Sequence, residues 1–271
     1  GLATAFSTSI WLSAVEGEVY AMSTFFTALT LWAVIKWYSL PDKPDSDRWL
    51  VFAIYAAGLS IGVHLLSILT FPALALFYYF KKYENHTLLG MAGASALGVV
   101  MIVALQSLII TGIPHLWTAF ELMTVNSFGL PFHSGVVPTV LLVGSLLTLP
   151  LLYLHGKIKS LTPIYVALGV LALTVFYYLS YGGGPGSSIT LGGFAKLAIL
   201  IGALFFATTY ALDKYRYLAQ LVLVSMTLVV ISFSTVGVIV IRANANTPIN
   251  MNAPSDPMRL LPYLNREQYG E

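Results

Sequence analysis

Long apolar runs separated by short polar breaks dominate the pattern of this 271-residue chain. The runs lie near the ~20 residues that a helix needs to cross the hydrocarbon core of a bilayer, and the breaks contain Pro, Gly or charged residues. The pattern predicts eight membrane-spanning helices. They run approximately over residues 18–37, 49–64, 66–80, 88–112, 134–155, 161–181, 192–212 and 217–241.

Composition agrees with this pattern. The chain is 58% hydrophobic and only 9% charged, and its mean hydropathy is +0.83, values typical of a polytopic helical membrane protein. We therefore expect an all-α membrane bundle. A net charge of +2 provides no basic field for nucleic acid, so that class of partner is excluded. The absence of cysteine excludes disulfides, thiolate nucleophiles and sulfur-ligated metals.

The positive charges predict an orientation in the membrane. If the segment around residues 16–18 is outside, the inner connections contain nine of the 13 Lys and Arg residues, and the outer loops between spans contain none. The nine are Lys36, Lys43, Arg48, Lys81, Lys82, Lys157, Lys159, Lys214 and Arg216. Lys196 falls within the seventh span, and Arg242, Arg259 and Arg266 follow the last one. This asymmetry supports both the number of spans and their orientation.

Two regions are expected from these boundaries. Residues 1–241 form the transmembrane domain, and residues 242–271 form an extended tail on the outer face or a linker to a further soluble domain, because Pro and Asn are frequent there. The opening residues 1–10 are too short to span a bilayer and resemble the end of a helix. We therefore expect a fragment that lacks its N-terminal helices.

The stretch before the first complete span carries the most suggestive polar groups. Glu16 and Glu18 lie between Trp11 and Tyr20 in a chain with few charges. At a membrane interface such carboxylates can hold a metal, orient a hydroxyl or transfer a proton. The alternative is that they stabilise the positive end of the next helix.

A histidine lies at the outer end of the second predicted span. His64 can act as a proton carrier, a metal ligand or a phosphate contact beside the acidic segment, or it can form one hydrogen bond in a helix turn. Three spans packed as hairpins would bring His64 and the acidic segment together. A divalent cation such as Mg, Mn or Zn would suit these ligands, but the residues do not identify a metal.

Two further outer segments are candidates for binding. The loop 113–135 contains Glu121 and His133 among aromatic residues and fits either an interfacial helix or a lid over a lipid-linked substrate. Arg242, at the membrane boundary, is a candidate for contact with a phosphate. The glycine-rich stretch 182–188 lacks the Lys and Ser/Thr of a phosphate-binding loop and is expected to be a turn.

Three blocks of this sequence resemble a known family. They are SIWLSAVEGEVYAMSTFFTAL (9–29), DRWLVFAIYAAGLSIGVHLLSILTFPALALFYYFKKY (47–83) and ANTPINMNAPSDPMRLLPYLNREQYG (245–270). The blocks are similar to those of the large Bacteroidetes-type membrane proteins related to protein O-mannosyltransferases, within the GT-C glycosyltransferases.

The resemblance implies transfer of a sugar, mannose in the first instance, from a polyprenyl-phosphate donor to Ser or Thr hydroxyls of an acceptor protein. The reaction would take place on the periplasmic face of a bacterial inner membrane. By motif, Glu16 and Glu18 match the family's acidic block and His64 matches its histidine, which makes these three the candidate catalytic residues. Tyr20, Arg242, Glu121 and His133 are the candidate substrate-binding residues. A further acidic motif of the family is missing here, so we expect these 271 residues alone to be inactive.

Two other functions fit a hydrophobic chain of this kind. A transporter or flippase of lipid-linked sugars would need polar residues deep within the spans, where the sequence has few. A scaffold whose spans only anchor another domain would not need the paired carboxylates. Both alternatives remain open at the level of sequence.

Overall fold

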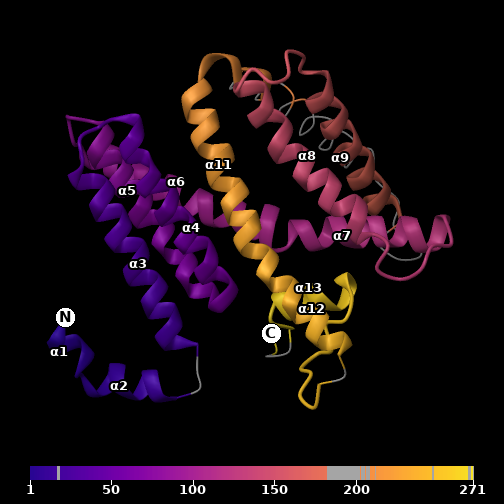
Figure 1. Ribbon diagram of the computed structural model, residues 1–271, viewed down its shortest axis with the longest axis horizontal. Coiled ribbons are helices and arrows are strands. Elements are labelled where there is room, and N and C mark those ends of the chain that lie inside the picture. Colours follow the sequence, from indigo (N-terminus) through magenta and orange to yellow (C-terminus); the bar gives the residue numbers. More distant parts are fainter. Residues whose placement is uncertain are drawn as a thin grey trace. The chain divides into compact units, whose positions relative to one another are not determined.

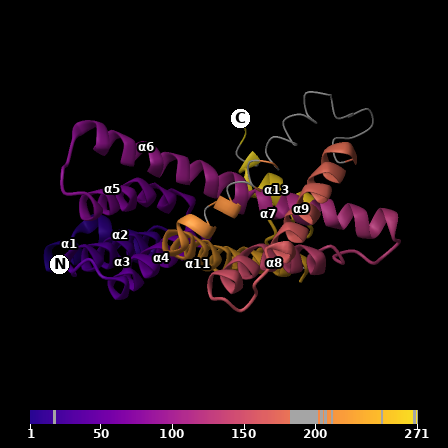
Figure 2. The ribbon, with the colours of Figure 1, turned by 90° about the horizontal axis from the view of Figure 1, so that it is seen from above.

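The computed structural model describes residues 1–16, 19–181, 202, 205, 208–210, 212–245, 247–267 and 270. Throughout these ranges the regular secondary structure is helical (Figures 1 and 2). The predicted all-α membrane fold is thereby confirmed. The chain divides into two compact units, which are described separately: unit 1 contains Gly1–Ser107 and Thr227–Val236, and unit 2 contains Leu108–Met226 and Gly237–Glu271.

Unit 1 consists of helices that pack in pairs. Its main elements are α1 (Leu2–Ala5), α2 (Thr8–Val15), α3 (Tyr20–Ser39), α4 (Asp47–Val63), α5 (Thr70–Lys82) and α6 (Leu88–Ala104), with short 3-10 turns at Pro44–Ser46 (η1) and Leu65–Leu69 (η2). Helix α3 packs along α4 and α5 along α6, and Figure 2 shows the second pair side by side. Small buried residues such as Ala33, Ala53 and Ala57 allow the close approach of α3 and α4.

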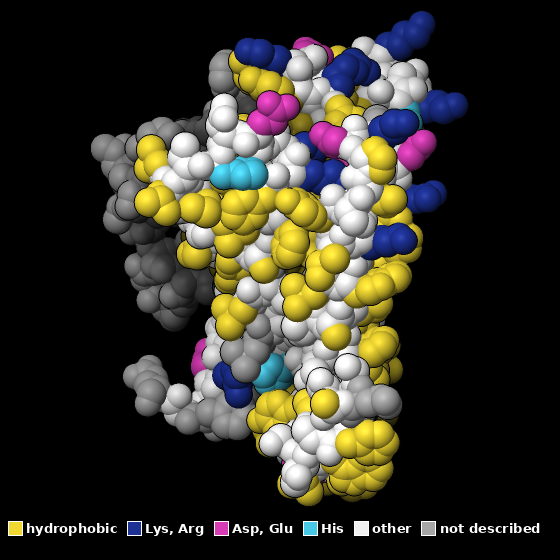
Figure 3. All heavy atoms as spheres, turned by 90° about the vertical axis from the view of Figure 1, so that its left-hand side faces the viewer, with side chains coloured by type: hydrophobic (Ala, Val, Ile, Leu, Met, Phe, Trp, Pro, Cys, Tyr) yellow, Lys and Arg dark blue, Asp and Glu magenta, His cyan; other side chains and the backbone are white. Residues whose placement is uncertain are grey.

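Polar contacts join the C-terminal ends of α3 and α5 to the N-terminal end of α4. The indole Nε1 of Trp37 donates to Asp47 Oδ1 at 2.7 Å, and Lys81 Nζ donates to the carbonyl oxygens of Trp37 and Leu40. Lys82 forms an ion pair with Asp42. Burial disfavours the charged form of Lys81 and lowers its pKa. Its ammonium group nevertheless satisfies carbonyl groups that would lack a partner at the end of α3. In Figure 3, Lys, Arg, Asp and Glu side chains gather toward the upper end of the face drawn, above a broad hydrophobic band.

Unit 2 contains the longer apolar helices. Its elements are the end of the π-helical η3 (Leu105–Ile110), α7 (Gly112–Leu122), the π-helical η4 (Met123–Ser127), α8 (Val136–Leu154), α9 (Thr162–Tyr181), the start of α11 (Arg216–Phe233), α12 (Gly237–Asn244) and α13 (Pro257–Leu264). The rest of α11 and the 3-10 turn Ser234–Val236 (η5) belong to unit 1. Leu116, Phe120, Leu142 and Ala167 form a core among α7, α8 and α9.

Four helical stretches in the described ranges are long and apolar enough to cross a membrane. They are Leu88–Ser127, Val136–Leu154, Thr162–Ser180 and Arg216–Asn244, and the bent pair Thr8–Val15 and Tyr20–Ser39 makes a fifth if it counts as one span. The protein is thus a multi-pass membrane protein, but the predicted count of eight is not confirmed. Helices α4 and α5 have only 17 and 13 residues, and the predicted span 192–212 falls mostly outside the described residues.

Two segments outside the predicted spans contain helix. The predicted span 88–112 continues as helix and π-helix to Ser127, so most of the stretch 113–135, expected as an interfacial helix or a lid, is helical and continuous with the span. The tail is not extended throughout, because α13 forms within it and buries Pro257, Leu260, Leu261 and Leu264. Helix α13 packs against α7, and burial of its apolar side explains why this part of the tail folds back.

Candidate functional site

Tyr20 and His64 meet at one end of the α3 and α4 pair. Tyr20 is the first residue of α3, and His64 follows the last residue of α4. Their ring centroids are 5.8 Å apart with an interplanar angle of 53°. The Tyr20 side chain is 52% exposed, whereas His64 is half-buried. The structure therefore brings together two of the predicted site residues at a place that a substrate can reach.

Glu16 belongs to the same end of unit 1. It follows α2, its side chain is exposed, and its backbone N–H donates to the Leu12 carbonyl oxygen at 3.0 Å. Only four positions separate Glu16 from Tyr20, so the acidic segment leads directly into the end of α3 that carries the aromatic contact. Glu18 lies outside the described residues.

The conformation at His64 ends α4. Its backbone is extended, with φ −156° and ψ 124°, and its N–H donates to the Ser60 carbonyl oxygen at 2.8 Å. The carbonyl oxygen of His64 accepts the N–H of Ser67 at 3.1 Å, at the start of the short turn η2. The chain therefore reverses between α4 and α5 with its backbone groups satisfied.

A chain of serine hydroxyls holds this reversal against α3. Ser60 Oγ donates to Ser67 Oγ, and the Oγ atoms of Ser67 and Ser23 are 3.1 Å apart. Ser60 and Ser67 are buried at 1% and 4% exposure. Ser23 lies one helical turn after Tyr20, so the hydroxyl chain connects the His64 turn to the part of α3 that places Tyr20. The sequence analysis missed these serines; the available signal is two hydroxyls flanking His64 in an otherwise apolar stretch.

Replacing Ser67 with alanine should loosen this turn. The change leaves the buried Ser60 hydroxyl without its acceptor, which costs about 1–2 kcal/mol of unfolding free energy. We expect faster amide hydrogen exchange across Leu65–Leu69 and a lower unfolding midpoint in detergent. As a control, the exposed Ser39, which donates only locally to the Lys36 carbonyl, should tolerate the same change. Unaltered exchange in the Ser67 variant would show that the hydroxyl chain does not hold the turn.

Glu121 and His133 form a second polar cluster, in unit 2. The Glu121 side chain is 1% exposed, and its two oxygens accept the backbone N–H groups of His133 and Gly135, the latter at 2.9 Å. His133 has an exposed side chain and a positive φ of 70°. Glu121 thus connects α7 to the turn that precedes α8. This geometry favours a positioning role for Glu121, and its predicted role in substrate binding stays a prediction.

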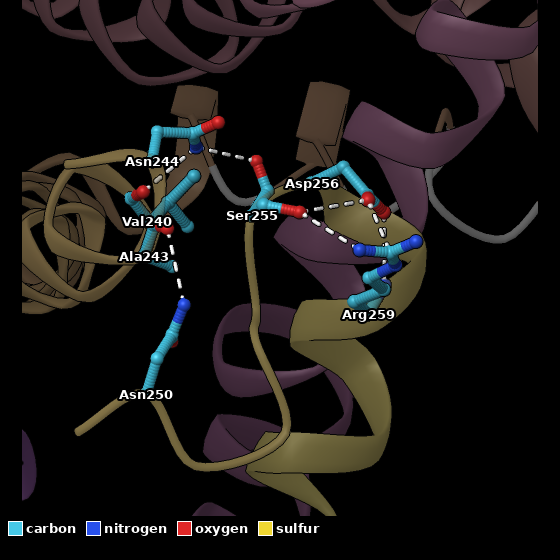
Figure 4. Close-up of polar contacts among 7 residues, drawn as sticks. All are labelled: Val240, Ala243, Asn244, Asn250, Ser255, Asp256 and Arg259. Carbon is cyan, nitrogen blue, oxygen red and sulfur yellow. Dashed lines mark hydrogen bonds and ion pairs between the residues drawn. The ribbon is translucent and has the colours of Figure 1, made fainter. Parts of the chain in front are cut away.

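Arg242 lies in α12 of unit 2, with an exposed side chain. The residues around it order the start of the tail, as Figure 4 shows. Asn244 Nδ2 donates to the carbonyl oxygens of Val240 and Ser255 at 2.9 and 2.8 Å, and Asn250 Nδ2 donates to that of Ala243 at 3.1 Å. The tail therefore leaves α12 along a defined path.

The start of α13 is fixed in the same network (Figure 4). The Asp256 side chain caps the helix by accepting the Arg259 N–H at 3.0 Å, and Arg259 Nε lies 3.5 Å from Asp256 Oδ2. Arg259 also donates to the hydroxyl of Ser255 at 3.4 Å. Because Arg259 is engaged with Asp256 and Ser255, Arg242 stays the better candidate for contact with a phosphate.

An apolar groove runs along α7, α8 and α9 within unit 2. Its volume is about 550 Å³. Phe120, Leu141, Leu142 and Val166 are among the residues that line it. Such a surface suits a hydrocarbon chain. By contrast, no group of three His, Asp or Glu side chains in the described part of the protein is arranged to hold a metal ion, so a divalent cation stays a prediction.

Comparison with known proteins gives one match. The family described as "Protein O-mannosyl-transferase TMEM260 N-terminal domain" matches residues 1–87. No curated protein and no solved structure matches the chain. The matched stretch contains the first two of the three sequence blocks and lies in unit 1. The resemblance to protein O-mannosyltransferases is confirmed for this stretch, whereas the Bacteroidetes type and the GT-C assignment stay predictions.

Proposed function

We propose that this chain is the membrane part of a GT-C glycosyltransferase that transfers a sugar, with mannose as the first candidate, to Ser or Thr hydroxyls of a protein. The donor is a polyprenyl-phosphate sugar, and the reaction takes place on the periplasmic face of a bacterial inner membrane. The observation that carries the proposal is that the family match covers the segment that contains Glu16, Glu18 and the contact between Tyr20 and His64.

The chemistry of such a transfer fits the polar groups of unit 1. A carboxyl group of Glu16 or Glu18 accepts the proton of the attacking hydroxyl, which strengthens the nucleophile. His64 contacts the phosphate of the leaving group, and the exposed Tyr20 ring and hydroxyl border the sugar. Unit 2, taken by itself, offers an apolar groove along α7, α8 and α9 that suits a hydrocarbon chain, and the exposed Arg242 is its candidate for contact with a phosphate.

The test is sugar transfer in membranes of cells that express the full-length protein, because these 271 residues alone are expected to be inactive. Radiolabelled polyprenyl-phosphate mannose and a Ser/Thr-containing peptide serve as donor and acceptor. The double variant Glu16→Gln/Glu18→Gln should lose activity by a factor on the order of 10² or more, because it removes the general base. The variant Glu84→Gln, which changes an exposed glutamate of the α5–α6 connection, should retain activity.

Two results would contradict the proposal. Full transfer by the double Gln variant would exclude both glutamates as the base. The second is that the wild-type protein folds and binds the lipid but transfers no sugar from any lipid-linked donor tested. That result would favour a transporter or flippase of lipid-linked sugars over a transferase.

A further inference from the structure

Two turns of unit 2 that are distant in sequence are joined at one end of its helices. The turn after α8 begins at His155, and α11 begins at Arg216. Arg216 Nη2 donates to the Leu154 carbonyl oxygen at 3.0 Å, and the Tyr153 hydroxyl donates to Asp213 Oδ1 at 3.0 Å. These contacts make one continuous surface from the two turns.

This surface is strongly basic. We define the basic turn as the exposed side chains of Lys157, Lys159, Lys214 and Arg216. Within residues 153–162 and 212–217 the sequence contains one acidic residue, Asp213, and its carboxyl group already accepts the Tyr153 hydroxyl. No carboxyl group among the described residues forms an ion pair with any of the four. Four cations therefore share one small surface with a single acidic group.

The position of the basic turn is that of a membrane interface. It lies where α8 ends and α9 begins, and both are long and apolar enough to cross a bilayer. Tyr210, Tyr215 and Tyr217 beside it are 44–49% exposed, and tyrosine is enriched at the level of lipid headgroups. Lys214 lies over the rings of Tyr210 and Tyr215, at 4.9 and 5.5 Å from their centroids, which keeps its charge at this level.

The comparable turns of unit 1 have a different charge balance. Residues 36–48 and 81–84, which are joined by the Lys82–Asp42 ion pair, contain five Lys and Arg residues and four Asp and Glu residues. An anionic membrane surface would be attracted little to those turns but strongly to the basic turn. The contrast provides a matched control within the same chain.

We propose that the basic turn is a binding surface for anionic phospholipid headgroups, through which unit 2 selects acidic lipids in the adjacent leaflet. Lys157 and Lys159 provide exposed charges, and Lys214 and Arg216 are held by their contacts with Tyr210, Tyr153 and the end of α8. The headgroup phosphates form the ion pairs that no described carboxyl group forms with these four cations. This surface is independent of the proposed sugar transfer.

Lipid binding to the purified 271-residue chain in detergent tests the proposal. Equal amounts of phosphatidylglycerol and phosphatidylcholine are added, and the lipids that stay bound are counted by native mass spectrometry. The wild type should retain phosphatidylglycerol preferentially, and the preference should weaken with salt. In Lys157→Gln/Lys159→Gln it should fall roughly tenfold, since each cation near an anionic surface contributes separately.

Two control variants complete the experiment. Lys157→Arg/Lys159→Arg keeps the charge and should keep the preference, and Lys36→Gln/Lys43→Gln removes the same charge from unit 1 and should also keep it. Unchanged unfolding midpoints show that the variants are folded. The proposal is overturned if the wild type shows no preference, if Lys157→Gln/Lys159→Gln binds as the wild type does, or if the unit 1 variant loses as much. Displacement of the lipid by millimolar inorganic phosphate would also overturn it, because that result indicates a site for free anions.

Discussion

Replacing Gly98 with valine is expected to force α6 away from α5 and to lower the free energy of unfolding of unit 1 by about 3 kcal/mol. A Cβ atom at this position would lie 2.4 Å from Pro72 Cα and 2.9 Å from Pro72 N. Both are backbone atoms, so no side-chain rotation can relieve the overlap. Alanine carries the same Cβ and should destabilise in the same direction, with a smaller effect than valine.

Gly93 provides the control, because it lies in the same helix and a Cβ there would meet nothing within 4 Å. Gly93→Val and Gly98→Val therefore share the cost of a β-branched residue in a helix and differ in the clash. Unfolding of both variants in detergent, followed by loss of helical circular dichroism, measures the difference. Equal midpoints for the two would show that α5 and α6 do not rely on this contact.

The contact at Gly98 also bears on the candidate site. Pro72 lies in the first turn of α5, directly after η2, and the hydroxyl of Thr70 donates to the Ser67 carbonyl oxygen at 2.8 Å. Packing of α6 against Pro72 therefore stabilises the start of α5 and, through the Thr70–Ser67 hydrogen bond, the turn that follows His64. We expect Gly98→Val to increase amide exchange in η2 as well as in α5 and α6.

Local signals predicted the general nature of the fold. Apolar runs in a chain with few charges identified an all-α membrane protein. Packing of the spans as hairpins was expected to bring His64 to Glu16 and Glu18, and that approach stays a prediction; the structure places the ring centroids of His64 and Tyr20 5.8 Å apart. The serine chain could not be predicted in this way, since the Ser23–Ser67 contact joins helices 44 residues apart.

Prolines do not exclude helix at two places in this chain. Residues 113–135 were expected to form an interfacial helix or a lid, and Pro114 lies in the first turn of α7, where a proline is tolerated. Pro257 was taken as a sign of an extended tail, yet it follows the capping residue Asp256 and starts α13. The predicted count of eight spans is not confirmed for another reason. The division of residues 49–80 into two helices was predicted, but with 17 and 13 residues these helices are shorter than a typical span.

Replacing Glu121 with alanine should be the most damaging change in unit 2. Its side-chain oxygens accept two backbone N–H groups from the turn that precedes α8, and Gly135, one of the donors, is buried. Alanine leaves both donors unpaired, and we expect a loss of about 3 kcal/mol of unfolding free energy. The turn lies close against α7, because a Cβ at Gly135 would be 2.4 Å from the Glu121 backbone nitrogen. Little space is therefore left for water to replace the lost acceptor.

Glutamine at position 121 separates a positioning role from substrate binding. It keeps one acceptor oxygen but turns an NH₂ group toward a backbone N–H, so stability should fall less than with alanine while amide exchange at His133 and Gly135 still rises. The same change at the exposed Glu267 should alter neither quantity. If Glu121→Gln instead left stability and exchange unchanged and raised the KM for the sugar donor, Glu121 would contact the substrate. A carboxyl group held by two backbone donors at 1% exposure favours the first outcome, because its acceptor capacity is already directed at the protein.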